Sequence, residues 1–127
     1  MSIFNRAPAV LTRHRIGEQA EKSACRYLQQ QGLKLLKKNF HSRFGEIDLI
    51  MQDDDTVVFV EVRCRQANAQ VNSLESVTAS KIEKIRKTAT YYLLQFEQLP
   101  CCRFDVIAMI HNGDNSDYNI DWIKNAF

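Results

Sequence analysis

Two apolar stretches decide the fold: Gly45-Glu46-Ile47-Asp48-Leu49-Ile50, and Val57-Val58-Phe59-Val60-Glu61-Val62-Arg63-Cys64-Arg65. Both are rich in β-branched and apolar residues, and the turn residues Asp53-Asp54-Asp55 lie between them. This pattern predicts two strands that pair across a turn.

These strands also carry charges that a buried strand normally excludes. Side chains alternate between the two faces of a strand, so Glu46 and Asp48 share one face of the first strand. By the same rule Glu61, Arg63 and Arg65 share one face of the second. Because burying an unpaired charge costs on the order of several kcal/mol, the cluster needs partners. A bound metal ion and an internal ion-pair network both meet that need.

The composition is that of one ordinary globular domain. The chain has 127 residues, of which 45% are hydrophobic and 25% charged, and its net charge of +2 is too small to indicate a partner. It shows no signal peptide and no apolar run long enough to span a bilayer, and its four cysteines form no CxxC pair. We therefore expect a cytoplasmic protein with reduced thiols and no membrane partner.

The order of elements predicts an α/β fold with a mixed sheet of about five strands and two main helices. Residues 1–13 lack periodicity and predict a flexible basic arm, and residues 14–127 predict a single domain. Ser80 followed by Glu83 fits a capping box at the start of the second helix. The expected elements are a helix over 16–31, strands over 33–40, 45–50 and 57–65, a loop over 66–75, a helix from 78 or 80 to 95, strands over 103–110 and 118–123 around an Asn112-Gly113 turn, and a tail over 124–127.

Asp48 and Glu61 could supply the carboxylates of a metal site. Mg²⁺ binds through one or two carboxylates, several waters and substrate phosphate, and it supports phosphodiester hydrolysis. Glu21 lies at the flank of the apolar stripe of the first helix, so it is the helix acid able to reach the sheet. An exposed surface acid is the alternative for Glu21. For Glu61, a salt bridge with Arg63 or Arg43 fits the pattern as well as a metal does.

At these residues the sequence resembles the YraN family of bacterial proteins. The motif GEIDLI followed by VFVEVRCR carries the resemblance, and further matches cover most of the chain: Ala20 to Gly32 in the first helix, Asn39 to Ile50, Ser76-Val77-Thr78 with Lys81, Arg103 to Val106, and Asp121 to Phe127. The resemblance implies a restriction-endonuclease-like sandwich, the PD-(D/E)XK nuclease fold shared with Holliday-junction resolvases.

Carried over residue by residue, the resemblance implies a nuclease site. Asp48, Glu61 and Glu21 would bind Mg²⁺ or Mn²⁺, and Arg63 would stand where the motif has lysine. Arginine can clamp a phosphate but cannot act as a base. The supporting residues that the resemblance and the charge pattern suggest are Arg43, Arg65, Lys81 and Lys84 as nucleic-acid contacts, Glu46 as an acid beside the metal ligands, and Asp105 as the maker of a structural hydrogen bond or ion pair.

The sequence leaves three functions open. The first is a metal-dependent DNA endonuclease that acts on branched or structured DNA, with a homodimer as a compatible assembly. The second is a non-catalytic nucleic-acid-binding module on the same fold, in which Arg63 and the basic second helix hold phosphates. The third is an adaptor that binds other proteins.

Overall fold

The structure, a computed structural model, describes residues 9–66, 77–111 and 118–127, and within the first range it describes the side chains of residues 17–65. The expected loop over 66–75 and the Asn112-Gly113 turn fall almost wholly outside these residues. The elements are helices α1 (Ala9–Gln30) and α2 (Ala79–Leu93), and strands β1 (Lys34–Ser42), β2 (Gly45–Asp53), β3 (Thr56–Gln66), β4 (Cys101–His111) and β5 (Tyr118–Ile123).

The five strands form one mixed sheet in the order β1-β2-β3-β4-β5. Strands β3 and β4 run parallel, because α2 carries the chain back between them, whereas the other three pairs are antiparallel. The predicted α/β fold, with a mixed five-stranded sheet and two helices, is confirmed. The arrangement is consistent with a nuclease-like sandwich.

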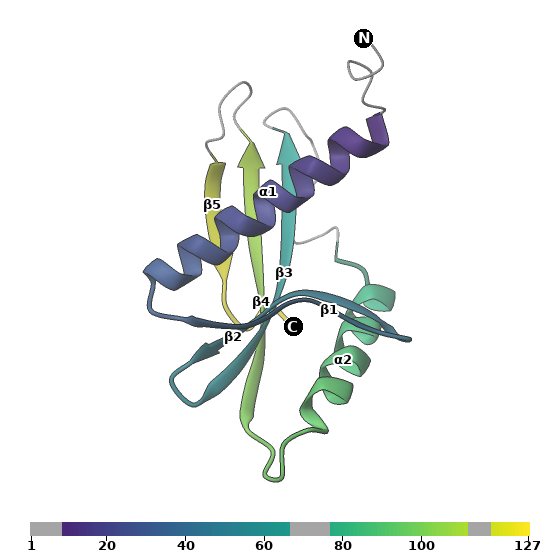
Figure 1. Cartoon of the computed structure of the whole chain (residues 1–127), viewed down its shortest axis with the longest axis vertical. Helices are drawn as coiled ribbons and strands as arrows, with labels where there is room; N and C mark the ends of the chain where they lie inside the picture. The colour runs from purple at the N-terminus through teal and green to yellow at the C-terminus, as the bar shows by residue number, and fades with distance from the viewer. Residues whose placement is uncertain (1–8, 67–76, 112–117) are drawn as a thin grey trace.

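The two helices lie on opposite faces of the sheet. Helix α1 crosses in front of β3, β4 and β5, while α2 lies beside the β1–β2 hairpin (Figure 1). Alternate residues of β3 divide between the two layers: Val58 and Val60 belong to the core under α1, and Val57 and Phe59 to the core under α2. The sheet is therefore buried on both sides, which explains the long apolar strands.

The start of the first helix and the capping residue of the second differ from the expected ones. Helix α1 begins at Ala9 rather than near Ile16, so the end of the expected arm is helical, and residues 1–8 lie outside the described part. The capping box at Ser80 is wrong. The N-cap of α2 is Thr78, whose hydroxyl accepts a hydrogen bond from the backbone N–H of Lys81 at 3.2 Å. Thr78 has the extended backbone that an N-cap needs, whereas Ser80 already lies inside the helix.

A buried charged network joins the start of β4 to the C-terminal segment. Asp105 is 0% exposed and accepts from Arg103 Nε at 3.1 Å, from Trp122 Nε1 at 2.9 Å and from the backbone N–H of Asn125 at 3.0 Å. Arg103 also contacts Asp53 at 3.0 Å. Since each oxygen of Asp105 has a donor, this acid has a structural role away from the β2–β3 acids.

Among the described residues, no helix has the length and apolar character needed to cross a membrane. All four cysteines are free thiols. Cys25 is a buried residue of α1, whereas Cys101 and Cys102 are exposed at the start of β4.

Candidate metal and nucleic-acid site

The candidate site forms where β2 and β3 separate. Their ladder runs from Asp53–Thr56 to Leu49–Val60, and the next bond along it is made by a side chain. The backbone N–H of Val62 donates to Asp48 Oδ2 at 2.8 Å. Asp48 thus takes the place of a strand partner, which holds its carboxylate at the fork between the strands.

Glu61 lies on the face of β3 that is turned toward α2. Only 5% of Glu61 is exposed, and its Oε2 contacts Lys81 Nζ of α2 at 2.9 Å and Arg63 Nη1 at 3.2 Å. Glu61 follows Phe59 by two residues, and Phe59 belongs to the core under α2, so the alternation of the strand brings Glu61 to the start of that helix. The salt bridge expected between Glu61 and Arg63 is present, and Lys81 joins it.

Glu21 approaches the same site from α1. Its pKa is raised, chiefly because burial disfavours the charged form, and the charges of Glu46, Glu18 and Glu61 add to the effect. A hydrogen bond with the side chain of Asn39 opposes the rise. Because Glu21 responds to the charge of Glu61, the helix acid is directed toward the sheet and is not an isolated surface acid.

The pKa of Asp48 is raised as well. Burial raises its pKa from 3.8 to about 8, with further contributions from the charges of Glu61 and Glu21. The hydrogen bond from Val62 and the charge of Lys81 only partly offset this. A partly buried acid that faces other acids favours a proton or a cation at the site.

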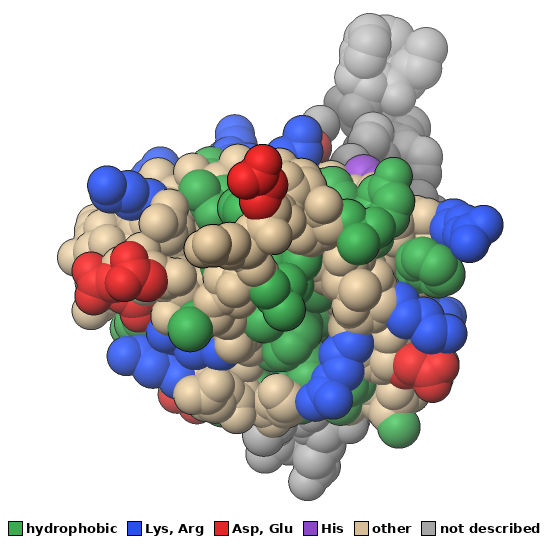
Figure 2. All heavy atoms as spheres, turned by 90° about the horizontal axis from the view of Figure 1, so that it is seen from below, with side chains coloured by type: hydrophobic (Ala, Val, Ile, Leu, Met, Phe, Trp, Pro, Cys, Tyr) green, Lys and Arg blue, Asp and Glu red, His purple; other side chains and the backbone are tan. Residues whose placement is uncertain are grey.

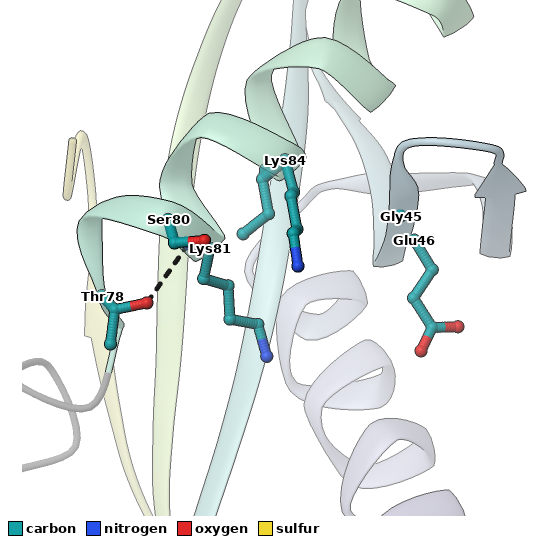
Figure 3. Close-up of a pocket in the computed structure, with 7 residues that line it drawn as sticks. Gly45, Glu46, Thr78, Ser80, Lys81 and Lys84 are labelled. Carbon is teal, nitrogen blue, oxygen red and sulfur yellow. Dashed lines mark hydrogen bonds between the residues drawn. The ribbon is translucent and has the colours of Figure 1, made fainter.

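A pocket of about 270 Å³ opens beside these acids, between the start of α2 and the start of β2. Lys81 and Lys84 extend from α2 toward the same side, and Glu46 faces them across the opening (Figure 3). Gly45 lets β2 begin here, because its φ of +151° disfavours other residues and its backbone packs beside Lys84 and Thr88. The two lysines give the pocket a positive wall suited to phosphate.

The remaining predicted residues lie farther out. Glu46 is exposed and contacts His41 Nδ1 at 3.3 Å, so it lies at the rim of the pocket. Arg43 is exposed on the β1–β2 turn, over the ring of Phe44. Among the described contacts, Arg65 donates to the carbonyl oxygen of Cys64 at 3.4 Å and not to an acid of the site.

Asn39 and Thr78 are site residues that the sequence reasoning missed. Asn39 has a positive φ of 48° and lies between the residues of β1 that pair with Leu49 and Ile47, so it stands opposite Asp48. The available signal was an asparagine, which tolerates the left-handed region, inside a predicted strand. Thr78 places the first turn of α2 and with it Lys81, and the hydroxyl three residues before Lys81 was its signal.

The residues fit a magnesium ion with few protein ligands. Among the described residues, no group of three or more His, Cys, Asp or Glu side chains is arranged to hold a metal as it stands. Mg²⁺ needs only one or two carboxylates, with waters and phosphate completing its shell. Asp48 and Glu61 meet that need, whereas Glu21 lies nearby without completing a three-carboxylate set.

Most of this chain, including the residues of the candidate site, can be aligned with known proteins. The profile described as "Uncharacterised protein family UPF0102" matches residues 20–109. A UPF0102 protein of Nitrosomonas europaea is 49% identical over 111 residues, which cover 87% of this chain and 92% of the relative. A UPF0102 protein of Coxiella burnetii is 46% identical over 114 residues, covering 88% and 91%. The matched span contains α1 from Ala20, the acids of β2 and β3, and Lys81.

Proposed function

The chain belongs to the UPF0102 (YraN) family, which the sequence resemblance anticipated, and from that premise and the site geometry we propose that it is a metal-dependent DNA endonuclease. One observation carries the proposal. Asp48 is held at the fork of β2 and β3 with a pKa raised to about 8, next to Glu61 and within the influence of Glu21. Such an arrangement destabilises the empty site and is best relieved by a divalent cation.

Each residue has a role in this proposal. Asp48 and Glu61 hold Mg²⁺ or Mn²⁺, and Glu21 supports the ion from α1. When bound, the ion stabilises charge on the phosphate and lowers the pKa of a bound water. Lys81 and Arg63, which both contact Glu61, hold it in place and stabilise negative charge on the scissile phosphate.

In this proposal Lys81 supplies the positive charge that a lysine supplies in the motif, where this chain has Arg63. Arg63 cannot exchange its proton at neutral pH, but the ammonium of Lys81 reaches the same carboxylate oxygen from α2. Arg63, two residues after Glu61, and Lys81, at the start of α2, therefore bring two cations to one acid. Arginine at position 63 is compatible with cleavage if Lys81 contributes the positive charge at the reacting phosphate.

The test is cleavage of supercoiled, linear and four-way-junction DNA with and without Mg²⁺ or Mn²⁺. We expect metal-dependent cleavage by the wild type, background activity for Asp48→Asn and Glu61→Gln, and a loss of about 10²–10³-fold for Lys81→Ala. Arg63→Lys should keep or raise activity, and Arg63→Ala should lower it. Lys34→Ala, at an exposed position on β1, is the matched control and should leave the rate unchanged.

The calorimetric isotherm of Mg²⁺ or Mn²⁺ gives an independent reading. Binding by the wild type, weakened in Glu21→Gln and lost in Asp48→Asn, would support the assignment of the three acids. No metal binding, with or without DNA, would rule the proposal out.

A non-catalytic nucleic-acid-binding module is the second candidate, and one observation favours it. Lys81 and Arg63 already neutralise Glu61, which lowers the demand for a metal. This function requires DNA binding that weakens steeply with salt, without cleavage under any metal condition. The cleavage assay and a salt titration of binding separate the two.

A further inference from the structure

A second depression adjoins the lysine-walled pocket along α2. It has a volume of about 300 Å³ and lies between the β1–β2 turn and the outer face of the helix. The two hollows are neighbours, because Phe44 of the second precedes Gly45 of the first, and Lys87 lies one turn after Lys84. The second hollow is lined by Phe44, Lys87, Thr90, Tyr91 and Leu94.

Its lining is aromatic and apolar, and much of it is open to solvent. Tyr91 is 53% exposed and Leu94 is 73% exposed, which is unusual for large apolar side chains on a helix that already buries its other face. Figure 2, which shows one face of the molecule, has hydrophobic side chains at the surface among Lys and Arg side chains. Exposed apolar side chains alone therefore do not identify what binds in the hollow, and a second property is needed.

That property is positive charge around an aromatic ring. The guanidinium of Arg43 lies 5.1 Å from the centre of the Phe44 ring, and Lys87 Nζ lies 6.0 Å from it. Lys87 also contacts Glu83 at 3.3 Å, but both side chains are largely exposed, so this pair only weakly reduces the positive charge. The hollow thus has an aromatic wall with cations beside it, and none of the described residues that line it is an acid.

The cations continue in a row toward the acids. Lys81, Lys84 and Lys87 recur every three residues, about 4.5 Å apart along the helix axis. A row of cations with aromatic side chains beside it is how proteins hold single nucleic-acid strands, because cations follow the phosphates and rings stack on bases.

We propose that this hollow is a subsite for an unpaired DNA base, stacked on Phe44 and Tyr91, in a strand whose backbone follows the three lysines to the acid site. The subsite rests on the proposed function for the identity of the nucleic acid and for the place of the bond that is cut. It defines the substrate as DNA with an unpaired nucleotide close to the bond that is cut. Fully paired DNA leaves the hollow empty.

The test is binding of oligonucleotides that carry one 2-aminopurine, single-stranded or at an unpaired position in a duplex, in EDTA so that no cleavage occurs. The wild type should quench the fluorophore at one position. Phe44→Leu keeps the apolar volume but removes the ring, and it should weaken binding of these probes about 5–100-fold, since stacking contributes about 1–3 kcal/mol per base. Binding of a fully paired duplex should be unchanged.

The controls separate stacking from general effects. Phe44→Tyr should bind as the wild type does, because it keeps the ring. Tyr91→Leu, at an exposed position, should weaken the same probes without affecting folding. Leu99→Ala, at a 75% exposed residue that does not line the hollow, should have no effect.

Two results would overturn the subsite. One is equal binding of unpaired probes by Phe44→Leu and wild type, or an equal loss for paired and unpaired DNA. The other is a change in oligomeric mass caused by Phe44→Leu or Tyr91→Leu without DNA, which would assign the hollow to a second copy. The proposed function fails differently, because wild type that binds and quenches but never cleaves disproves the nuclease and leaves the subsite intact.

Discussion

Two clusters of buried charge in this molecule look alike in composition and differ in how they are completed. In the first, Asp105 receives hydrogen bonds from Arg103, Trp122 and the backbone of Asn125. In the second, Asp48 receives a backbone hydrogen bond from Val62 and faces the charges of Glu61 and Glu21, which the charge of Lys81 offsets only in part. The first acid is saturated by donors, whereas the second is set against other acids.

The difference separates a structural charge from the charge of the candidate site. A buried carboxylate with all its donors in place holds elements together, here β4, β5 and the C-terminal segment. A carboxylate whose neighbours raise its pKa destabilises the fold at neutral pH, and a protein keeps such a site for what binds there. Removing each acid should therefore have opposite effects on stability.

The largest effect should come from the saturated acid. Asp105→Ala leaves the buried donors of Arg103 and Trp122 without their acceptor, and we expect the free energy of unfolding to fall by about 3–5 kcal/mol. Urea denaturation measures it. The exposed turn residue Asp55 is the control, since Asp55→Ala should change stability by no more than about 0.5 kcal/mol. A loss below about 1 kcal/mol at Asp105 would abolish the distinction between the clusters.

The acid of the candidate site should behave in the opposite way. A carboxyl whose pKa rises from 3.8 in the unfolded chain to about 8 in the folded one keeps its proton only when folded. The metal-free protein should thus lose stability progressively as pH rises from about 4 to about 8. Asp48→Asn still accepts from Val62, and it should raise the free energy of unfolding at pH 8 by on the order of a few kcal/mol.

Unfolding curves of wild type and Asp48→Asn at pH 5 and pH 8, in EDTA, measure this difference. The gain should shrink at pH 5 and should also shrink when saturating Mg²⁺ stabilises the wild type. A variant less stable than the wild type at both pH values would place Asp48 with the structural acids.

The smallest effect concerns the helix start that brings Lys81 to Glu61. Thr78→Ala removes the side-chain acceptor for the backbone N–H of Lys81 and should cost about 1 kcal/mol. Ser80→Ala is the matched substitution two residues later, inside the helix, and should be within about 0.5 kcal/mol of the wild type. Thermal denaturation distinguishes them, and a larger loss at Ser80 would restore the capping box there.

Local sequence patterns predicted most of the elements but not their ends. The apolar alternation of 57–65 and the helical spacing of Ile82, Ile85 and Ala89 depend on neighbours in the chain, so they can be seen without coordinates. The start of α2 could not be assigned this way, because Thr78 and Ser80 both have cap-forming side chains and only the backbone path decides which one caps.

The sequence by itself pointed to three acids: the resemblance to the YraN family singled out Asp48 in GEIDLI, Glu61 in VEVRCR and Glu21 in the first helix. Only the tertiary structure decided how they are held. At the fork between β2 and β3, the backbone N–H of Val62 donates to Asp48. The packing of α2 brings Lys81 to Glu61 and leaves an aromatic hollow beside Phe44. The physical reason is that alternation and periodicity are set by adjacent residues. Partners across elements depend instead on where strands part and how a helix packs against them.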